Sequence, residues 1–138
     1  MTSYLLDTNS ISETRRKLPD PNFDQFFGSL QPPQLFLSVM TVGELRKGVA
    51  NQRKKDPSTA INLELWVNKI EHEFSERILD VDLETARIWG ELSAAGRTRP
   101  AIDTLLAATA LRYGLTVLTR NVADFQDLPI RWVNPWSV

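Results

Sequence analysis

Short apolar segments alternate with longer amphipathic ones along this chain of 138 residues. Runs of apolar residues bounded by polar ones predict five strands, at Tyr4–Leu6, Leu35–Val39, Arg77–Val81, Thr116–Leu118 and Ile130–Val133. Apolar residues at helical spacing predict helices between them, over Ser10–Lys17, 23–30, Thr41–Ala50, Ile61–Phe74, Leu83–Ala95 and Asp103–Tyr113. Strands that alternate with helices are typical of an α/β fold in which helices flank both faces of a mainly parallel central sheet.

Local signals predict where several of these helices begin and end. A hydroxyl residue followed three positions later by glutamate predicts capping boxes at Ser10–Glu13 and Thr41–Glu44. Asp82 suits an N-cap, and Gly114 suits the position after a helix C-terminus. The polar stretch 51–58 predicts a mobile loop.

The composition favours one domain, residues 1–138, that buries a core of its own. The absence of cysteine excludes disulfides, thiolate zinc sites and cysteine nucleophiles. No signal peptide and no apolar stretch long enough to cross a membrane are evident, so we expect a soluble, cytoplasmic protein. The net charge of −1 argues against a protein that coats nucleic acid, although not against a nuclease.

Four carboxylates lie beside apolar segments where strand or loop gives way to helix: Asp7, Glu44, Asp103 and Asp124. Each alone is explained more simply as a cap, a turn residue or a partner of a helix dipole. If the fold brings them together, two charges about 4 Å apart repel by roughly 4 kcal/mol at an effective dielectric near 20. Such a cluster takes up protons or binds a divalent cation. Metal-dependent phosphodiester chemistry is therefore the leading hypothesis from the residues alone.

Other chemistries lack the residues that they require. His72, the single histidine, lies among glutamates on the polar face of a predicted helix, which argues against a histidine base or zinc ligand. Without a base, no serine can act in a catalytic triad. No glycine-rich phosphate-binding loop is present.

Four segments, LLDTN, SVMTVGELRKGV, RPAIDTLLAATAL and LTRNVADFQDLPI, together with the closing VNPW, resemble the PIN domain, and within it the VapC-type toxins and their FitB-like relatives. The resemblance implies a PIN-like three-layer sandwich and a ribonuclease that acts as the toxin of a toxin–antitoxin pair. The catalytic acids that it implies, which would also bind Mg²⁺ or Mn²⁺, are Asp7, Glu44, Asp103 and Asp124. The supporting polar residues that it implies are Asn9, Thr119 and Asn121.

The resemblance also implies homodimers, a small antitoxin whose tail enters or blocks the site, and operator DNA bound through that antitoxin. Carboxylates are the ligands that hard divalent cations prefer, and we expect Asp7 and Asp103 to be the principal ones. We expect single-stranded or looped RNA as substrate, with three basic residues at the rim meeting its phosphates: Arg15, Arg46 and Arg97.

Three alternatives stay open at this point. The chain could be a housekeeping nuclease outside any toxin system, or a non-catalytic regulator that keeps the fold and binds a partner or an operator. A phospho-acceptor domain also uses an acidic pocket in a parallel sheet, but it requires a lysine after the last strand. The corresponding stretch here, 118–121, reads LTRN and has none.

Overall fold

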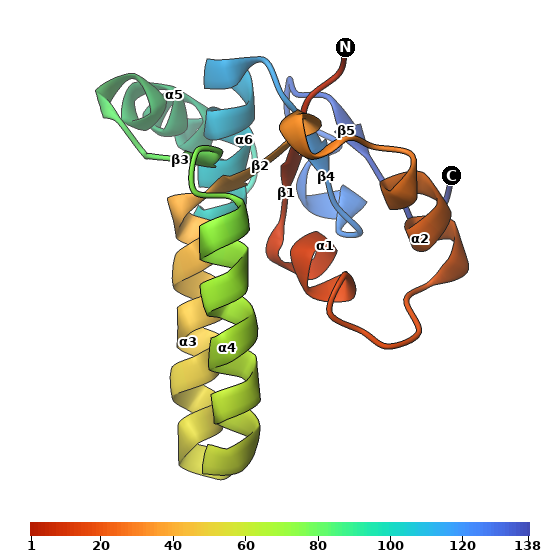
Figure 1. The fold of residues 1–138 in the computed structure, drawn as a ribbon. Coiled ribbons are helices and arrows are strands. Elements are labelled where there is room, and N and C mark those ends of the chain that lie inside the picture. The colour runs from red at the N-terminus through yellow and green to blue at the C-terminus, as the bar shows by residue number, and fades with distance from the viewer.

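A five-stranded sheet forms the centre of the computed structural model, which describes residues 1–138 (Figure 1). The strands are β1 (Tyr4–Leu6), β2 (Leu35–Ser38), β3 (Ile78–Leu79), β4 (Thr116–Leu118) and β5 (Trp132–Val133). Their order is β3-β2-β1-β4-β5, and every neighbouring pair is parallel. The carboxyl ends of β1, β2 and β4 therefore meet at one edge of the sheet, where β1 is central.

The helices lie in two groups, one on each face of the sheet. They are α1 (Thr8–Glu13), α2 (Pro21–Gly28), α3 (Val39–Lys55), α4 (Pro57–Glu73), α5 (Leu83–Ala94) and α6 (Ala101–Tyr113), with short 3₁₀ helices η1 (Pro32–Gln34) and η2 (Val122–Asp124). None of them combines the length and the apolar character that crossing a membrane requires.

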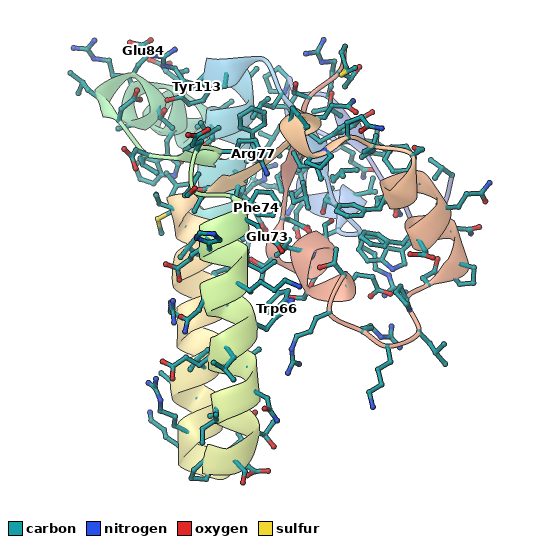
Figure 2. The ribbon with its side chains drawn as sticks, viewed as in Figure 1. Trp66, Glu73, Phe74, Arg77, Glu84 and Tyr113 are labelled. Carbon is teal, nitrogen blue, oxygen red and sulfur yellow. The ribbon has the colours of Figure 1, made fainter.

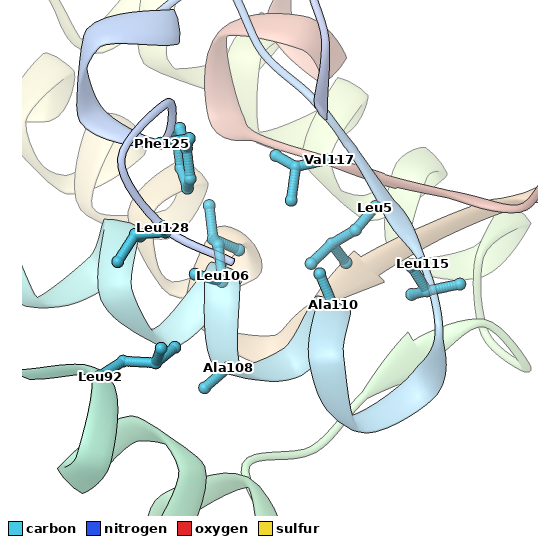
Figure 3. Packing of buried hydrophobic residues seen from close by; sticks show 10 residues of the cluster. Leu5, Leu92, Leu106, Ala108, Ala110, Leu115, Val117, Phe125 and Leu128 are labelled. Carbon is cyan, nitrogen blue, oxygen red and sulfur yellow. The ribbon is translucent and has the colours of Figure 1, made fainter. Parts of the chain in front are cut away.

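Two apolar clusters hold the layers together. Leu5 and Leu6 of β1 belong to different clusters, because successive side chains of a strand point to opposite faces. Figure 3 shows the first cluster, in which Leu106 and Ala110 of α6 lie near Leu5 and Val117 of the sheet. The second cluster packs the other face against α1, α3 and α4. This arrangement confirms the predicted α/β three-layer fold.

Helices α3 and α4 form a long antiparallel hairpin that projects from the body of the molecule (Figure 1). Only Asp56 separates them, so the prediction of a mobile loop over 51–58 is wrong. Pro57 disfavours helical geometry at the residue before it and is well tolerated as the first residue of α4. The Asp56 carboxylate then caps α4 by accepting from the backbone N–H of Ser58 at 3.2 Å, and it also accepts from the Thr59 hydroxyl at 2.6 Å.

Both predicted capping boxes are also wrong, because the residue before each helix caps it. Asp7 accepts from the backbone N–H of Ser10 at 2.8 Å and is the N-cap of α1. Ser38 caps α3 through the N–H of Met40 at 3.0 Å, which leaves Glu44 in the second turn of α3. The predicted caps at Asp82 and Gly114 are confirmed, the latter with a left-handed φ of 67°.

Candidate active site

Asp7 follows the central strand and is 6% exposed. Its N–H donates to the carbonyl oxygen of Leu118 at 3.2 Å, which ties the end of β1 to the end of β4. Burial raises the pKa of Asp7, hydrogen bonds from Thr119 and Ser10 oppose that rise, and the charge of Glu44 adds to it. Asp7 is thus a buried acid that neighbouring donors hold in place.

Asp103 lies in the first turn of α6, a helix buried on most sides. Burial is the main cause that raises the pKa of Asp103, to about 6. The charge of Asp124 and a hydrogen bond with Asp124 raise this pKa further, followed by the charges of Asp7 and Glu44. Because all three other acids act on Asp103, the four carboxylates predicted from the sequence share one electrostatic neighbourhood.

Glu44 reaches this neighbourhood from α3, and Thr8 holds it there. The Thr8 hydroxyl donates to the Glu44 carboxylate across 36 positions of sequence. Sequence reasoning missed Thr8, although its place directly after Asp7 in LLDTN was the available signal. One strand-to-helix turn therefore supplies a catalytic candidate and the hydroxyl that positions a second one.

Asp124 comes from η2, at the end of the segment that follows β4. The N–H of Asn121 donates to the buried Thr119 hydroxyl at 2.9 Å, which shapes the turn between β4 and η2. The Asn121 side chain makes no capping hydrogen bond, and Asn9 is exposed on α1. The structure thus gives Thr119 hydrogen bonds with Asp7 and with this turn, whereas the roles of the two asparagines stay predictions.

Arg97 and Arg99 form ion pairs with the segment that carries Asp124. The Arg99 side chain is 3% exposed and its guanidinium lies 2.6 Å from the Asp127 carboxylate. Arg97 also approaches Asp127, with Nε to Oδ2 at 3.5 Å. Nothing in the local sequence singles out Asp127, which resembles an ordinary turn residue until its arginine partners are known.

The three arginines predicted at the rim have different surroundings. Arg46 donates through Nε to Glu71 of α4 at 2.7 Å, so its charge is used to join the helices of the hairpin. Arg97 lies 3.8 Å from Asp124, at the edge of the acids. Arg15 is exposed and lies over the ring of Trp66.

The donor set at this edge suits a hard divalent cation, because it consists of carboxylate and hydroxyl oxygens. Burial and mutual repulsion raise the pKa of Asp7 and Asp103, so a cation placed among them would relieve an existing cost. In the conformation shown, no group of three or more acidic or histidine side chains is arranged to hold a metal ion. The chemistry of the residues fits a metal, and the carboxylates would have to turn towards one another to bind it.

The sequence matches the family model of the PIN domain over residues 4–130. Toxin FitB of Neisseria gonorrhoeae is 36% identical, and the alignment covers 96% of this chain and 97% of that protein. The VapC ribonuclease Y4jK of Sinorhizobium fredii is 31% identical, with 96% and 97% covered. The structure of FitAB bound to an IR36 DNA fragment superimposes with a TM-score of 0.82 at 33% identity, covering 98% of this chain and 96% of that one. The chain therefore belongs to the PIN-domain family, in its group of VapC- and FitB-type toxin ribonucleases.

Proposed function

We propose that this chain is a Mg²⁺- or Mn²⁺-dependent endoribonuclease that acts as the toxin of a toxin–antitoxin pair. The observation that carries the proposal is the common neighbourhood of four acids at the carboxyl edge of the sheet, where the pKa of Asp103 reaches about 6. Ligand sites of open parallel sheets lie at this edge. Relatives named as ribonucleases and toxins along nearly the whole chain support the same activity.

Each acid has a proposed role. Asp7 and Asp103 are the principal metal ligands, and Glu44 and Asp124 bind a second ion or act through waters. A bound cation would supply charge for the scissile phosphate and lower the pKa of a water molecule that attacks it. Thr8 orients Glu44 by a direct hydrogen bond.

The polar residues around the acids complete the proposed site. Thr119 donates to Asp7 and favours the charged form of that carboxylate. Asn9 and Asn121 are exposed, and in this proposal their amides orient water or substrate. Arg15 is the basic residue whose charge has no acidic partner and is free for a phosphate contact, whereas Arg46 is engaged with Glu71 and Arg97 with Asp124 and Asp127.

The proposed partners follow from the relatives. FitAB was solved as a complex on DNA, and VapBC2 of Rickettsia felis was solved bound to a fragment of its promoter. We propose a small antitoxin for this chain, homodimers, and a toxin–antitoxin assembly that binds its operator through the antitoxin. Residues 1–138 then act as a single PIN domain on RNA in the cytoplasm.

Incubation of the purified chain with single-stranded RNA should give cleavage that requires Mg²⁺ or Mn²⁺ and stops when EDTA is added. Expression of the chain alone in bacteria should arrest growth, and co-expression of the antitoxin should restore it. Cleavage without growth arrest would indicate a housekeeping nuclease. Growth arrest that persists in Asp7→Asn would indicate a regulator that acts without catalysis.

Replacing Thr8 with valine should lower kcat for RNA cleavage about tenfold, because a positioning hydrogen bond to a metal ligand is typically worth this much. Valine keeps the size of the side chain but leaves Glu44 without its donor. Thr8→Ser should restore the rate, and KM and the melting temperature should not change. Thr59→Val is the matched control, because the Thr59 hydroxyl also donates to a carboxylate, that of Asp56, but at the tip of the hairpin. A normal kcat in Thr8→Val would exclude the positioning role.

A further inference from the structure

A groove of about 270 Å³ lies between α1 and the α3–α4 hairpin, and Glu44 is the one of the four acids that lines it. Thr8 and Glu44 line the end next to the catalytic candidates, and Trp66 of α4 lines the other. Figure 2 shows Trp66 projecting from α4 towards α1. The groove therefore shares Thr8 and Glu44 with the candidate active site and is also lined by an aromatic ring.

The two ends of the groove differ in chemistry. Trp66 is half-buried, so that part of its ring packs on the core cluster while the rest stays accessible in the groove. The Arg15 guanidinium lies 5.9 Å from the centre of the Trp66 ring. Arg15 forms no ion pair, in contrast to Arg46 and Arg97. An aromatic face and an uncompensated cation thus lie together, beside acids suited to a metal.

We propose that this groove binds one nucleobase of a single-stranded RNA next to the scissile phosphate. The base stacks on Trp66, and the adjoining phosphate contacts Arg15. This inference rests on the proposed function, because it takes the acids as the place of cleavage. Aromatic rings and arginines are the groups with which proteins bind unpaired bases and their phosphates. In a duplex the bases are stacked on one another, so a duplex cannot fill the groove.

Gly48 of α3 offers a way to block the groove without disturbing the fold. It lines the groove, and no atom lies within 4 Å of a Cβ built on it. A leucine there would extend into the groove without a clash at its first carbon. Leucine is also a better helix former than glycine, so Gly48→Leu should fold at least as well as the parent chain.

The test measures RNA affinity in the Asp103→Asn background, in which the substrate should stay intact. A fluorescently labelled single-stranded oligonucleotide of mixed sequence is titrated in the presence of Mg²⁺, and its anisotropy gives Kd. Trp66→Leu and Gly48→Leu should each weaken binding about tenfold, and Trp66→Phe by less than about threefold, because any aromatic ring offers a stacking face. Arg15→Gln should weaken binding and reduce the salt dependence of Kd.

Trp132→Leu is the matched control, because Trp132 is an exposed tryptophan on β5 that does not line the groove. This variant should bind RNA as the parent does. The proposal is overturned if Trp66→Leu and Gly48→Leu keep the parent's affinity and melting temperature, as they would if the groove received a protein segment instead. It is also overturned if a duplex of the same sequence binds equally well. Failure of the proposed function would appear separately, as a lack of cleavage by the unmodified chain.

Discussion

Replacing Asp103 with asparagine is expected to abolish RNA cleavage and to stabilise the fold above pH 6 in EDTA. Asparagine keeps the shape of the side chain but removes the charge on which the other three acids act. Loss of one charged group that acts directly on the reacting atoms typically lowers kcat by roughly a thousandfold. The initial rate of RNA cleavage with saturating Mg²⁺ measures this loss. Cleavage at the normal rate would show that the site is assigned wrongly.

The gain in stability follows from the direction of the pKa shift. Burial, with Asp124 as the next cause, raises the pKa of Asp103 from 3.8 to about 6. The stability that protonated Asp103 contributes is complete below pH 3.8 and is lost as the pH rises through about 6. Above that pH the ionised carboxylate opposes folding. Because Asp103 is only half-buried and solvent screens its charge, we expect Asp103→Asn to gain about 1 kcal/mol, or about 3 °C in melting temperature.

The matched control is Asp80→Asn, which changes an exposed acid that follows β3. This variant should keep both the rate and the melting temperature of the parent. At pH 4 the melting temperatures of Asp103→Asn and the parent should converge, because the parent's Asp103 is then largely protonated. A gain in stability that does not depend on pH would show that the ionisation of Asp103 is not its cause.

The layers of this fold could be predicted from the sequence because parallel strands are buried on both faces. The segments Tyr4–Leu6 and Thr116–Leu118 are short, apolar and bounded by polar residues, and both form strands within those limits. The end of α6 at Gly114 was equally predictable, because glycine accepts the left-handed conformation found there. The local pattern of apolar residues and the conformational preference of glycine are therefore enough to predict these elements.

The finer parts of the site depend on partners that are distant in the sequence, and local patterns do not reveal them. Thr41 and Glu44 have the spacing of a capping box, yet Glu44 pairs with Thr8 and the Thr41 hydroxyl is buried without a partner. The hydrogen bond between Arg46 and Glu71 could not be predicted either, because the two residues are 25 positions apart. The four acids could be predicted as a group only because the resemblance to PIN domains supplied their association.

The fold offsets part of the repulsion among the acids by placing helix N-termini beside them. Asp7 is the N-cap of α1, and Asp103 lies in the first turn of α6. The unpaired N–H groups and the positive end of the dipole at each N-terminus favour a carboxylate, typically by about 0.3–1 kcal/mol. Burial, together with the charges of the neighbouring acids, nevertheless raises the pKa of both groups above its ordinary value. A net excess of negative charge thus remains, and it is available to bind a cation.

Saturating Mg²⁺ or Mn²⁺ is therefore expected to raise the melting temperature of the protein at pH 7.5, and progressively less as the pH falls below 6. A ligand that binds only the folded state stabilises it by about 2.7 kcal/mol at a concentration 100 times its Kd. The metal competes with the proton on Asp103, whose pKa is about 6. The apparent Kd should accordingly rise about tenfold for each pH unit below that value. Thermal melts over a series of Mg²⁺ concentrations and pH values measure both effects without RNA.

Asp103→Asn should lose most of the metal-induced rise in melting temperature at every pH, because the carboxylate that competes for the proton is also a proposed ligand. Asp80→Asn should keep the full rise, since this acid is exposed and is not among the groups whose charges raise the pKa of Asp103. If Mg²⁺ stabilised Asp103→Asn as strongly as the parent, the cation would be binding elsewhere on the surface. If the rise in the parent were the same at pH 5 and pH 7.5, Asp103 would not be a ligand, and the assignment of the metal to these four acids would fail.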